Sequence, residues 1–214
     1  MRLDIFWSFR SPYAYLAVDR LVNIATDYTV DARLRVVRPL ALREPDFFKK
    51  ARPQFLPYML HDLAREGERL GVKISLPQPD PVDMDLTTGV VAREQPHIDR
   101  LMSLGVAAQR AGKGLAAAQA ISRRIWSGEP DWHLGDALKD ALNAAGCEFE
   151  ALHQWSETHT EDVKAEIKEN EADQMKHHWG VPLMVLGEES FFGQDRIDTL
   201  LWRLNEAGLK RNEP

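Results

Sequence analysis

The sequence contains a single cysteine, Cys147, and no long apolar run. One thiol cannot form an internal disulfide, and its isolation excludes two-cysteine redox motifs and cysteine-rich zinc sites. No segment is both long enough and apolar enough to span a bilayer as a helix. The net charge of −6 leaves no basic excess for binding phosphate backbones. We therefore expect a cytoplasmic protein that binds neither membranes nor nucleic acid, with an inert thiol at Cys147.

Metal-binding patterns are also missing, although the chain has seven histidines. Neither His153 with His159 nor His177 with His178 puts two rings on one helix face with a third ligand nearby. The aspartates of residues 80–85 lack the glycine and the spacing of a calcium-binding loop. We therefore predict no metal site.

The chain has 214 residues, 44% of them apolar, which suffices for one large domain or for a domain with an insertion. Apolar spacing predicts a strand over residues 2–7, a helix over residues 12–27 and a second strand over residues 33–37. A connection of this length between two strands favours a right-handed βαβ unit. Further helices are expected over residues 51–70, 98–111, 115–126, 135–145, 148–159 and 160–177, with an extended stretch at 72–76 and a proline-rich loop at 77–81.

The pattern changes at Val181. Residues 183–186 and 190–192 are predicted to be strands, and residues 194–209 a closing helix. The order is therefore βαβ, then a block of helices, then ββα.

This order predicts the α/β class and a thioredoxin-like fold with a large all-helical insertion between its βαβ and ββα halves. We assign residues 1–40 and 178–214 to the thioredoxin-like domain and residues 41–177 to the helical insertion domain. That fold has a cis proline just before its third strand, facing the start of the first helix, and Pro182 stands at this place.

Ser11 directly precedes Pro12, and a hydroxyl N-cap followed by proline is a strong signal for the start of a helix. The positive end of a helix favours anions, including a thiolate. Ser11-Pro12-Tyr13-Ala14 also stands where thioredoxin-like oxidoreductases carry Cys-x-x-Cys, so dithiol chemistry is impossible here. Ser11 is either a cap alone, the commoner role of such a serine, or a cap that also binds a ligand.

Six motifs occur in order along the chain. They are Ser11-Pro12-Tyr13-Ala14-Tyr15-Leu16, Arg38-Pro39, Tyr58 with Asp62 and Arg65, Ile125-Trp126-Ser127-Gly128, Gly180-Val181-Pro182 and Phe191-Phe192-Gly193-Gln194-Asp195-Arg196. Together they resemble the motifs of the 2-hydroxychromene-2-carboxylate isomerase family, kin of the kappa-class glutathione transferases in the DsbA-like branch of the thioredoxin fold. The resemblance covers essentially the whole chain.

The resemblance implies that glutathione is the cofactor. Ser11 would be the catalytic residue and would hydrogen-bond the sulfur of glutathione, which the start of the helix helps to hold as a thiolate. The backbone of Val181, presented by a cis Pro182, would pair with the cysteinyl backbone as an added strand does.

The resemblance also implies a binding site for the γ-glutamyl end of glutathione. Asp195 would meet its ammonium group, while Gln194, Asp195 and the first amides of the closing helix would bind its carboxylate. Arg196 belongs to the same group of glutathione-binding residues. Two structural interpretations compete with these roles: Asp195 as a helix N-cap, and Arg196 as the partner of acidic neighbours.

The segment over residues 40–50 departs from the family, because it lacks the Gly-Gly and the Lys and Asn residues that touch glutathione there. The lysine expected three places before Tyr58 is replaced by Phe55. Lys49, Lys50 and Arg52 are the cations available to replace it, and the sequence does not choose among them.

The function implied is a glutathione-dependent isomerase that acts on an aromatic carboxylate from aromatic degradation, such as 2-hydroxychromene-2-carboxylate, and that forms a homodimer. The alternatives are a kappa-class-like transferase or peroxidase acting on electrophiles or peroxides, and a non-catalytic binding or chaperone-like module. Trp7, Phe9, Tyr13 and the helices around Trp126 either wall the acceptor pocket or belong to the core.

Overall fold

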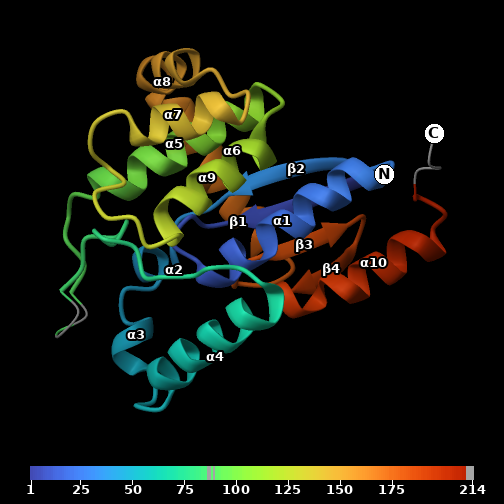
Figure 1. The fold of residues 1–214 in the computed structure, drawn as a ribbon, viewed down its shortest axis with the longest axis horizontal. Coiled ribbons are helices and arrows are strands. Elements are labelled where there is room, and N and C mark those ends of the chain that lie inside the picture. Colours follow the sequence, from blue (N-terminus) through green and yellow to red (C-terminus); the bar gives the residue numbers. More distant parts are fainter. Residues whose placement is uncertain (86–87, 89, 211–214) are drawn as a thin grey trace.

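The computed structural model describes residues 1–85, 88 and 90–210. Four strands form one mixed sheet in the order β2-β1-β3-β4. β1 (Arg2–Trp7) runs parallel to β2 (Asp31–Val36) and antiparallel to β3 (Leu183–Leu186), and β3 is antiparallel to β4 (Glu189–Phe192). Figure 1 shows this sheet at the centre of the molecule, so that the two ends of the chain meet in its middle strands.

α1 (Pro12–Asp27) connects the two parallel strands, which need such a crossover. It begins at Pro12 because Ser11 caps it and because proline has no amide hydrogen to leave unpaired at this position. Its apolar residues recur at helical spacing and bury one face of the helix, with Leu21 and Ile24 in the core.

The helical segment follows β2. It contains α2 (Leu40–Arg43), α3 (Phe47–Lys50), α4 (Phe55–Leu70), α5 (Pro96–Arg110), α6 (Gly114–Trp126), α7 (Ala137–Ala144), α8 (Phe149–Thr158) and α9 (Thr160–Gln174). In Figure 1, α5 to α9 gather above the sheet, and α3 and α4 lie below it. α5, α6 and α9 contact β2, and α6 packs against α1.

The closing segment after β4 consists of a 3₁₀ turn, η1 (Gln194–Arg196), that leads directly into α10 (Ile197–Glu206). α10 contacts α1 and β4. Gly193 precedes the turn with φ of 101°, a backbone conformation that residues with a side chain rarely adopt.

One large apolar core joins the sheet to α1 and to the helices above it. Trp7, Phe9 and Trp126 are among its fully buried side chains. A smaller cluster of Phe6, Val37, Leu183 and Val185 lies apart from it. The large core takes residues from both predicted domains, and their division at residues 40/41 and 177/178 stays a prediction.

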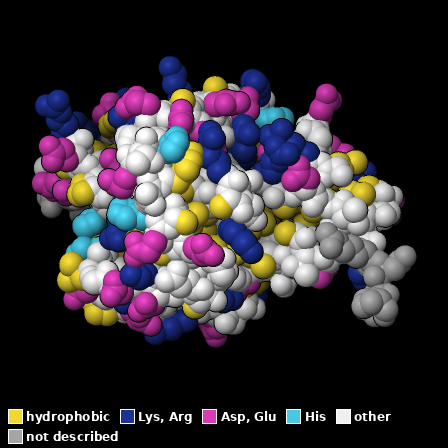
Figure 2. All heavy atoms as spheres, turned by 90° about the horizontal axis from the view of Figure 1, so that it is seen from above, with side chains coloured by type: hydrophobic (Ala, Val, Ile, Leu, Met, Phe, Trp, Pro, Cys, Tyr) yellow, Lys and Arg dark blue, Asp and Glu magenta, His cyan; other side chains and the backbone are white. Residues whose placement is uncertain are grey.

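The surface seen from above in Figure 2 carries interspersed acidic and basic side chains, with small apolar areas between them. This agrees with helices that turn their polar faces to solvent. Among the described residues, no helix combines the length and the apolar character needed to cross a membrane.

Most of the predicted elements are present, with shifted ends. The prediction for residues 51–70 is wrong at its start, because α4 begins at Phe55 and two short helices, α2 and α3, precede it. Pro45 and Pro53 interrupt this segment, since proline supplies no amide hydrogen to a helix interior. Residues 72–76, predicted to be extended, belong to no helix or strand. The helix expected to reach residue 177 ends at Gln174.

Gly105 tests the packing of α5 on the sheet. A Cβ at this position would lie 2.8 Å from the ring of Phe9 and 3.0 Å from Val36 Cγ2. Because both neighbours are buried, we expect Gly105→Ala to lower the free energy of unfolding by about 1–3 kcal/mol in chemical denaturation. Ser103→Ala on the same helix is the matched control and should change it by less than about 0.5 kcal/mol. Equal stability of the two variants would contradict this account of the packing.

Candidate functional site at the start of α1

Ser11 lies at the corner between β1 and α1. Its Oγ accepts a hydrogen bond from the Ala14 amide at 3.2 Å, so Ser11 is the N-cap that the sequence predicts. The same hydroxyl donates to the carbonyl of Val181 at 3.4 Å. This second hydrogen bond is long for a hydroxyl donor and therefore weak, so the hydroxyl can donate to a better acceptor instead. The Ser11 hydroxyl can therefore cap α1 and still donate a hydrogen bond to a ligand.

Val181 is brought to Ser11 from the other end of the chain. The Val181–Pro182 peptide bond is cis, as expected. Within the described part of the chain, the backbone amide of Val181 has no hydrogen-bond partner, and its carbonyl has only Ser11. Unpaired backbone groups beside a cavity are available to pair with an extended ligand.

Three side chains hold the segment that carries Val181. The Gln174 amide is buried and donates to the carbonyls of Trp179, at 3.2 Å, and Gly180, at 2.8 Å. Arg43 donates to the Trp179 carbonyl at 3.0 Å, and His178 Nδ1 accepts from the Gly180 amide at 2.9 Å. The sequence did not predict this role for any of the three residues, and no motif marks it.

Two further contacts hold the turn that carries Ser11. The indole of Trp126 donates to the carbonyl of Phe9 at 3.0 Å. Arg10 forms a bidentate ion pair with Asp80, at 2.9 and 2.7 Å, which attaches the turn to the proline-rich loop. Trp126 and Phe9 therefore position the site from within the core.

The Tyr58, Asp62 and Arg65 motif lies on α4, and its aspartate contacts the site. Asp62 accepts hydrogen bonds from the Tyr13 hydroxyl at 2.8 Å and from Arg65 at 2.7 Å. Burial, and then the bond to Asp62, raises the pKa of Tyr13 well above its usual value, so the phenol stays protonated and donates. Tyr58 is exposed.

A cavity of about 240 Å³ opens beside Ser11. Its lining includes both serines of the turn, Ser8 and Ser11, together with Tyr13 and Val181. Five aromatic rings also line it: Phe47, Phe48, Phe55, Trp179 and Phe192.

Three of the aromatics considered for an acceptor pocket do not line this cavity. Trp7, Phe9 and Trp126 are fully buried in the core, and only Tyr13 of the four faces the cavity. The aromatic wall comes instead from α3, the start of α4 and the 179–192 segment. The short helix α3, which the sequence did not predict, is therefore part of the site.

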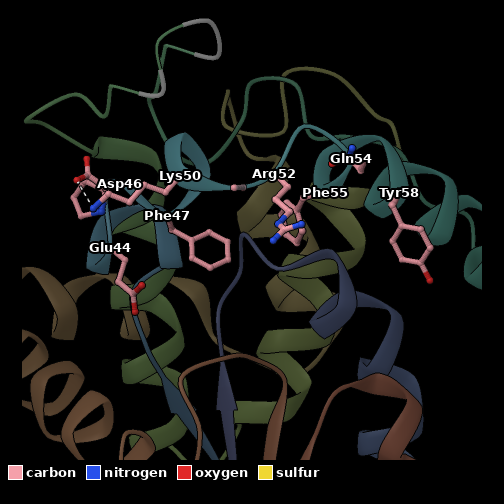
Figure 3. A pocket seen from close by; sticks show the side chains of 10 residues that line it. Glu44, Asp46, Phe47, Lys50, Arg52, Gln54, Phe55 and Tyr58 are labelled. Carbon is pink, nitrogen blue, oxygen red and sulfur yellow. Dashed lines mark ion pairs between the residues drawn. The ribbon is translucent and has the colours of Figure 1, made fainter.

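A larger hollow of about 880 Å³ adjoins this cavity and shares Phe47 and Phe55 with it. Figure 3 shows Lys50 turned toward Asp46, with which it forms an exposed ion pair at 3.0 Å. Lys50 and Arg52 line this outer hollow rather than the Ser11 cavity.

The other cations of the 40–52 segment differ in place. Lys49 lines a third hollow, with Arg38. Arg43 lines the Ser11 cavity itself, on α2. Phe55, at the position of the family's lysine, contributes a ring to the cavity in place of a charge.

The residues predicted to bind the γ-glutamyl end lie at η1, outside the Ser11 cavity. Asp195 and Arg196 are exposed, lie 3.7 Å apart and line a hollow that shares Phe192 with the Ser11 cavity. Asp195 makes no capping hydrogen bond, so its interpretation as an N-cap is wrong.

Gln194 is buried and both ends of its amide are used. Its oxygen accepts from Arg20, and its nitrogen donates to Glu66 at 2.6 Å. Glu66 also binds Arg69 on α4. The Gln194 side chain therefore joins α1 to α4 and is not free to bind a ligand carboxylate.

Two other expectations concern groups away from Ser11. Cys147 is buried, and burial raises the pKa of its thiol, which keeps it protonated. Within residues 1–85, 88 and 90–210, no cluster of three or more His, Cys, Asp or Glu side chains is placed to hold a metal ion.

The sheet order and a helix start that faces a cis-proline segment define a thioredoxin-like protein. The DsbA-like thioredoxin domain family matches residues 2–205. The chain belongs to this family, which confirms the predicted fold and its DsbA-like branch. No curated protein matches the chain in sequence.

Solved structures show the same fold. A 2-hydroxychromene-2-carboxylate isomerase matches with a TM-score of 0.69 at 20% identity, over 97% of this chain and 96% of that one. A probable DsbA oxidoreductase from Streptomyces coelicolor matches with a TM-score of 0.65 at 16% identity, over 100% of this chain and 92% of that one. The cytosolic disulfide reductase DsbM from Pseudomonas aeruginosa, solved with GSH, matches with a TM-score of 0.60 at 18% identity, over 96% of this chain and 100% of that one. At these identities the likeness shows the fold alone.

We expect His178 to make the stability of the protein depend on pH. Burial lowers the pKa of His178, so the unfolded chain binds its proton more readily than the folded protein does. This contribution to stability is complete above about pH 6.5 and is lost as the pH falls below that value. We expect the loss of stability between pH 7.5 and 5.5 to be smaller in His178→Gln, because glutamine accepts from the Gly180 amide and does not titrate.

The measurement is the free energy of unfolding of both proteins across this pH range. Burial and the nearby His133 also lower the pKa of His97, which contributes with the same sign, so only the difference between the two proteins reports on His178. Parallel pH profiles for wild type and His178→Gln would show that His178 does not matter for this behaviour.

Proposed function

We propose that the protein is a glutathione-dependent isomerase acting on an unsaturated aromatic carboxylate, such as 2-hydroxychromene-2-carboxylate. The observation that carries this proposal is the contact of the Ser11 hydroxyl with the backbone of Val181, whose amide has no partner among the described residues, beside an aromatic cavity. The solved DsbM structure with GSH supports the choice of thiol, since it belongs to a protein of the same fold.

The residues present fit glutathione at its central cysteinyl unit. The amide and carbonyl of Val181 are placed to pair with a peptide backbone laid alongside them, as in strand addition. The sulfur then faces Ser11, whose hydroxyl exchanges its weak bond to Val181 for a stronger one to a charged acceptor. The positive end of α1 adds to the stabilisation of that charge.

The γ-glutamyl end fits the hollow at η1. The exposed carboxylate of Asp195 is placed to pair with the ammonium group, and Arg196 beside it offers a cation to the carboxylate. Gln194 contributes through its backbone amide, because its side chain is already bound by Arg20 and Glu66. This hollow and the Ser11 cavity share Phe192, which is compatible with one extended ligand reaching both.

When bound, glutathione supplies a thiolate that adds reversibly to an unsaturated acid, so that a double bond becomes single, rotates and forms again. The chain holds the sulfur at Ser11 and presents the acceptor against it from the aromatic cavity. The cavity rings also exclude water from the reacting atoms. No redox partner is needed, in keeping with Ser11 and Ala14 at the positions of a dithiol.

Ser11→Ala tests the role of the hydroxyl. Losing a hydrogen bond to a charged sulfur costs about 1.5–3 kcal/mol, so we expect turnover of 2-hydroxychromene-2-carboxylate with glutathione to fall roughly 10- to 100-fold. The free energy of unfolding should fall by only about 1 kcal/mol, the usual contribution of an N-cap. Full activity of this variant would rule out the thiolate role.

Cys147→Ala is the control for the source of the sulfur, and it should retain activity. Product analysis of the same reactions distinguishes the class of reaction, since an isomerase returns glutathione unchanged. A thioether or oxidised glutathione would instead identify a transferase or a peroxidase.

Asp195→Asn tests the γ-glutamyl site separately. The variant keeps the size of the side chain and removes its charge. We expect the Kd for glutathione, measured by calorimetry, to rise roughly 10-fold or more, in line with one charged hydrogen bond. The melting temperature should barely change, because Asp195 is exposed and caps no helix. Unchanged affinity together with a clear drop in melting temperature would assign Asp195 to the fold.

A further inference from the structure

The Ser11 cavity carries an unbalanced positive charge. Two arginines, Arg10 and Arg43, are among the residues that line it, and none of its described lining residues is an aspartate or a glutamate. Arg10 is neutralised by its bidentate pair with Asp80. Arg43 therefore supplies the charge that remains.

Arg43 is half-buried and has no carboxylate partner among the described residues. It donates to the carbonyl of Arg38 at 2.9 Å, to the side chain of Gln174 at 3.1 Å and to the carbonyl of Trp179 at 3.0 Å. An arginine has five N–H groups, so these three bonds leave two unused. Two acids are near enough to act on Arg43. Glu171 is bound to Arg38, and Glu44, the next residue along the chain, forms no ion pair with Arg43.

Ser8 adds a second unused donor to the same cavity. Its side chain is 2% exposed, and its hydroxyl has no hydrogen-bond partner within the described part of the chain. A buried hydroxyl without a partner is costly in free energy and rare in native proteins. Because Ser8 lines the cavity, a ligand bound there is a candidate partner for this hydroxyl.

The size and the walls of the cavity restrict what it binds. Its volume of about 240 Å³ lies below the range of roughly 300–1,000 Å³ typical of ligand pockets, so it accepts only a small ligand of one ring or two fused rings. The aromatic walls favour a flat, apolar body. In so small a space, a ligand that touches the rings is also close to Ser8 and Arg43.

We propose that Arg43 binds the carboxylate of the acceptor substrate and that the Ser8 hydroxyl supplies a neutral hydrogen bond to it. Arg43 is then the residue that selects acids over neutral molecules of the same shape. This inference rests on the proposed function for the identity of the ligand as the acceptor substrate. Recognition of an aromatic acid by the cavity does not itself require glutathione.

The experiment is calorimetric titration with cinnamate and with cinnamamide, in the absence of glutathione. The two probes share a ring and a side chain and differ in charge. We expect the wild type to bind cinnamate more tightly. Arg43→Gln should raise the Kd for cinnamate about 10-fold or more, while the Kd for cinnamamide should change by less than about 3-fold. Arg43→Lys should keep the preference for the acid, because it keeps the charge.

Ser8→Ala should raise the Kd for cinnamate by about 3- to 10-fold without lowering the melting temperature, since the hydroxyl makes no hydrogen bond to any of the residues that the structure describes. Arg203→Gln, which removes one exposed positive charge from α10, is the control for net charge and should bind both probes as the wild type does.

Three results would overturn the proposal: no binding of cinnamate, equal binding of the two probes by the wild type, or equal weakening of both by Arg43→Gln. The last result would show that Arg43 acts only by holding the Trp179 carbonyl. A separate titration with glutathione tests the proposed function. Failure of glutathione to bind, with the preference for cinnamate intact, would overturn the proposed function and leave the acid site standing.

Discussion

The site depends on one long-range contact, the approach of the Ser11 hydroxyl to the carbonyl of Val181. These residues belong to opposite ends of the chain, and the sheet order puts them together because β1 and β3 are neighbours. A hydrogen bond of 3.4 Å is too weak to hold two segments by itself. Each segment must therefore be fixed independently, and the surrounding structure does this with buried polar contacts.

The helical segment supplies most of these contacts, so it acts as more than a cover for the sheet. Trp126 on α6 binds the backbone of the Ser11 turn, and Gln174 at the end of α9 binds the carbonyls that precede Val181. Both side chains are fully buried, where a hydrogen bond is stronger and an unpaired group is costly. The positions of these two segments are thus coupled to the packing of α6 and α9.

The sequence predicted the parts of this arrangement that depend on local chemistry. Ser11 before Pro12 located the start of α1. The alternation of residues 2–7 located β1, and the short apolar run of residues 183–186 located β3, because capping and residue patterns act over a few residues. Arg43, Gln174 and His178 could not be predicted, since their roles come from partners that only the folded chain brings near. The aromatic walls of the cavity were missed for the same reason. The sequence pointed to Trp7 and Trp126, but these side chains are buried in the core and do not line the cavity.

The absence of a thiol at positions 11 and 14 changes what this corner of the fold is suited to do. The start of α1 still stabilises negative charge, and the Val181 amide is still without a partner in the described part of the chain, so the corner keeps the features that hold a thiolate on an extended peptide. In the proposed function, serine and alanine at these positions mean that the sulfur arrives with the ligand. A bound thiol that leaves unchanged requires no second sulfur and no electron acceptor. In the proposed function, the cavity beside Ser11 therefore serves a second molecule, and its unbalanced charge from Arg43 suits one that is itself an anion.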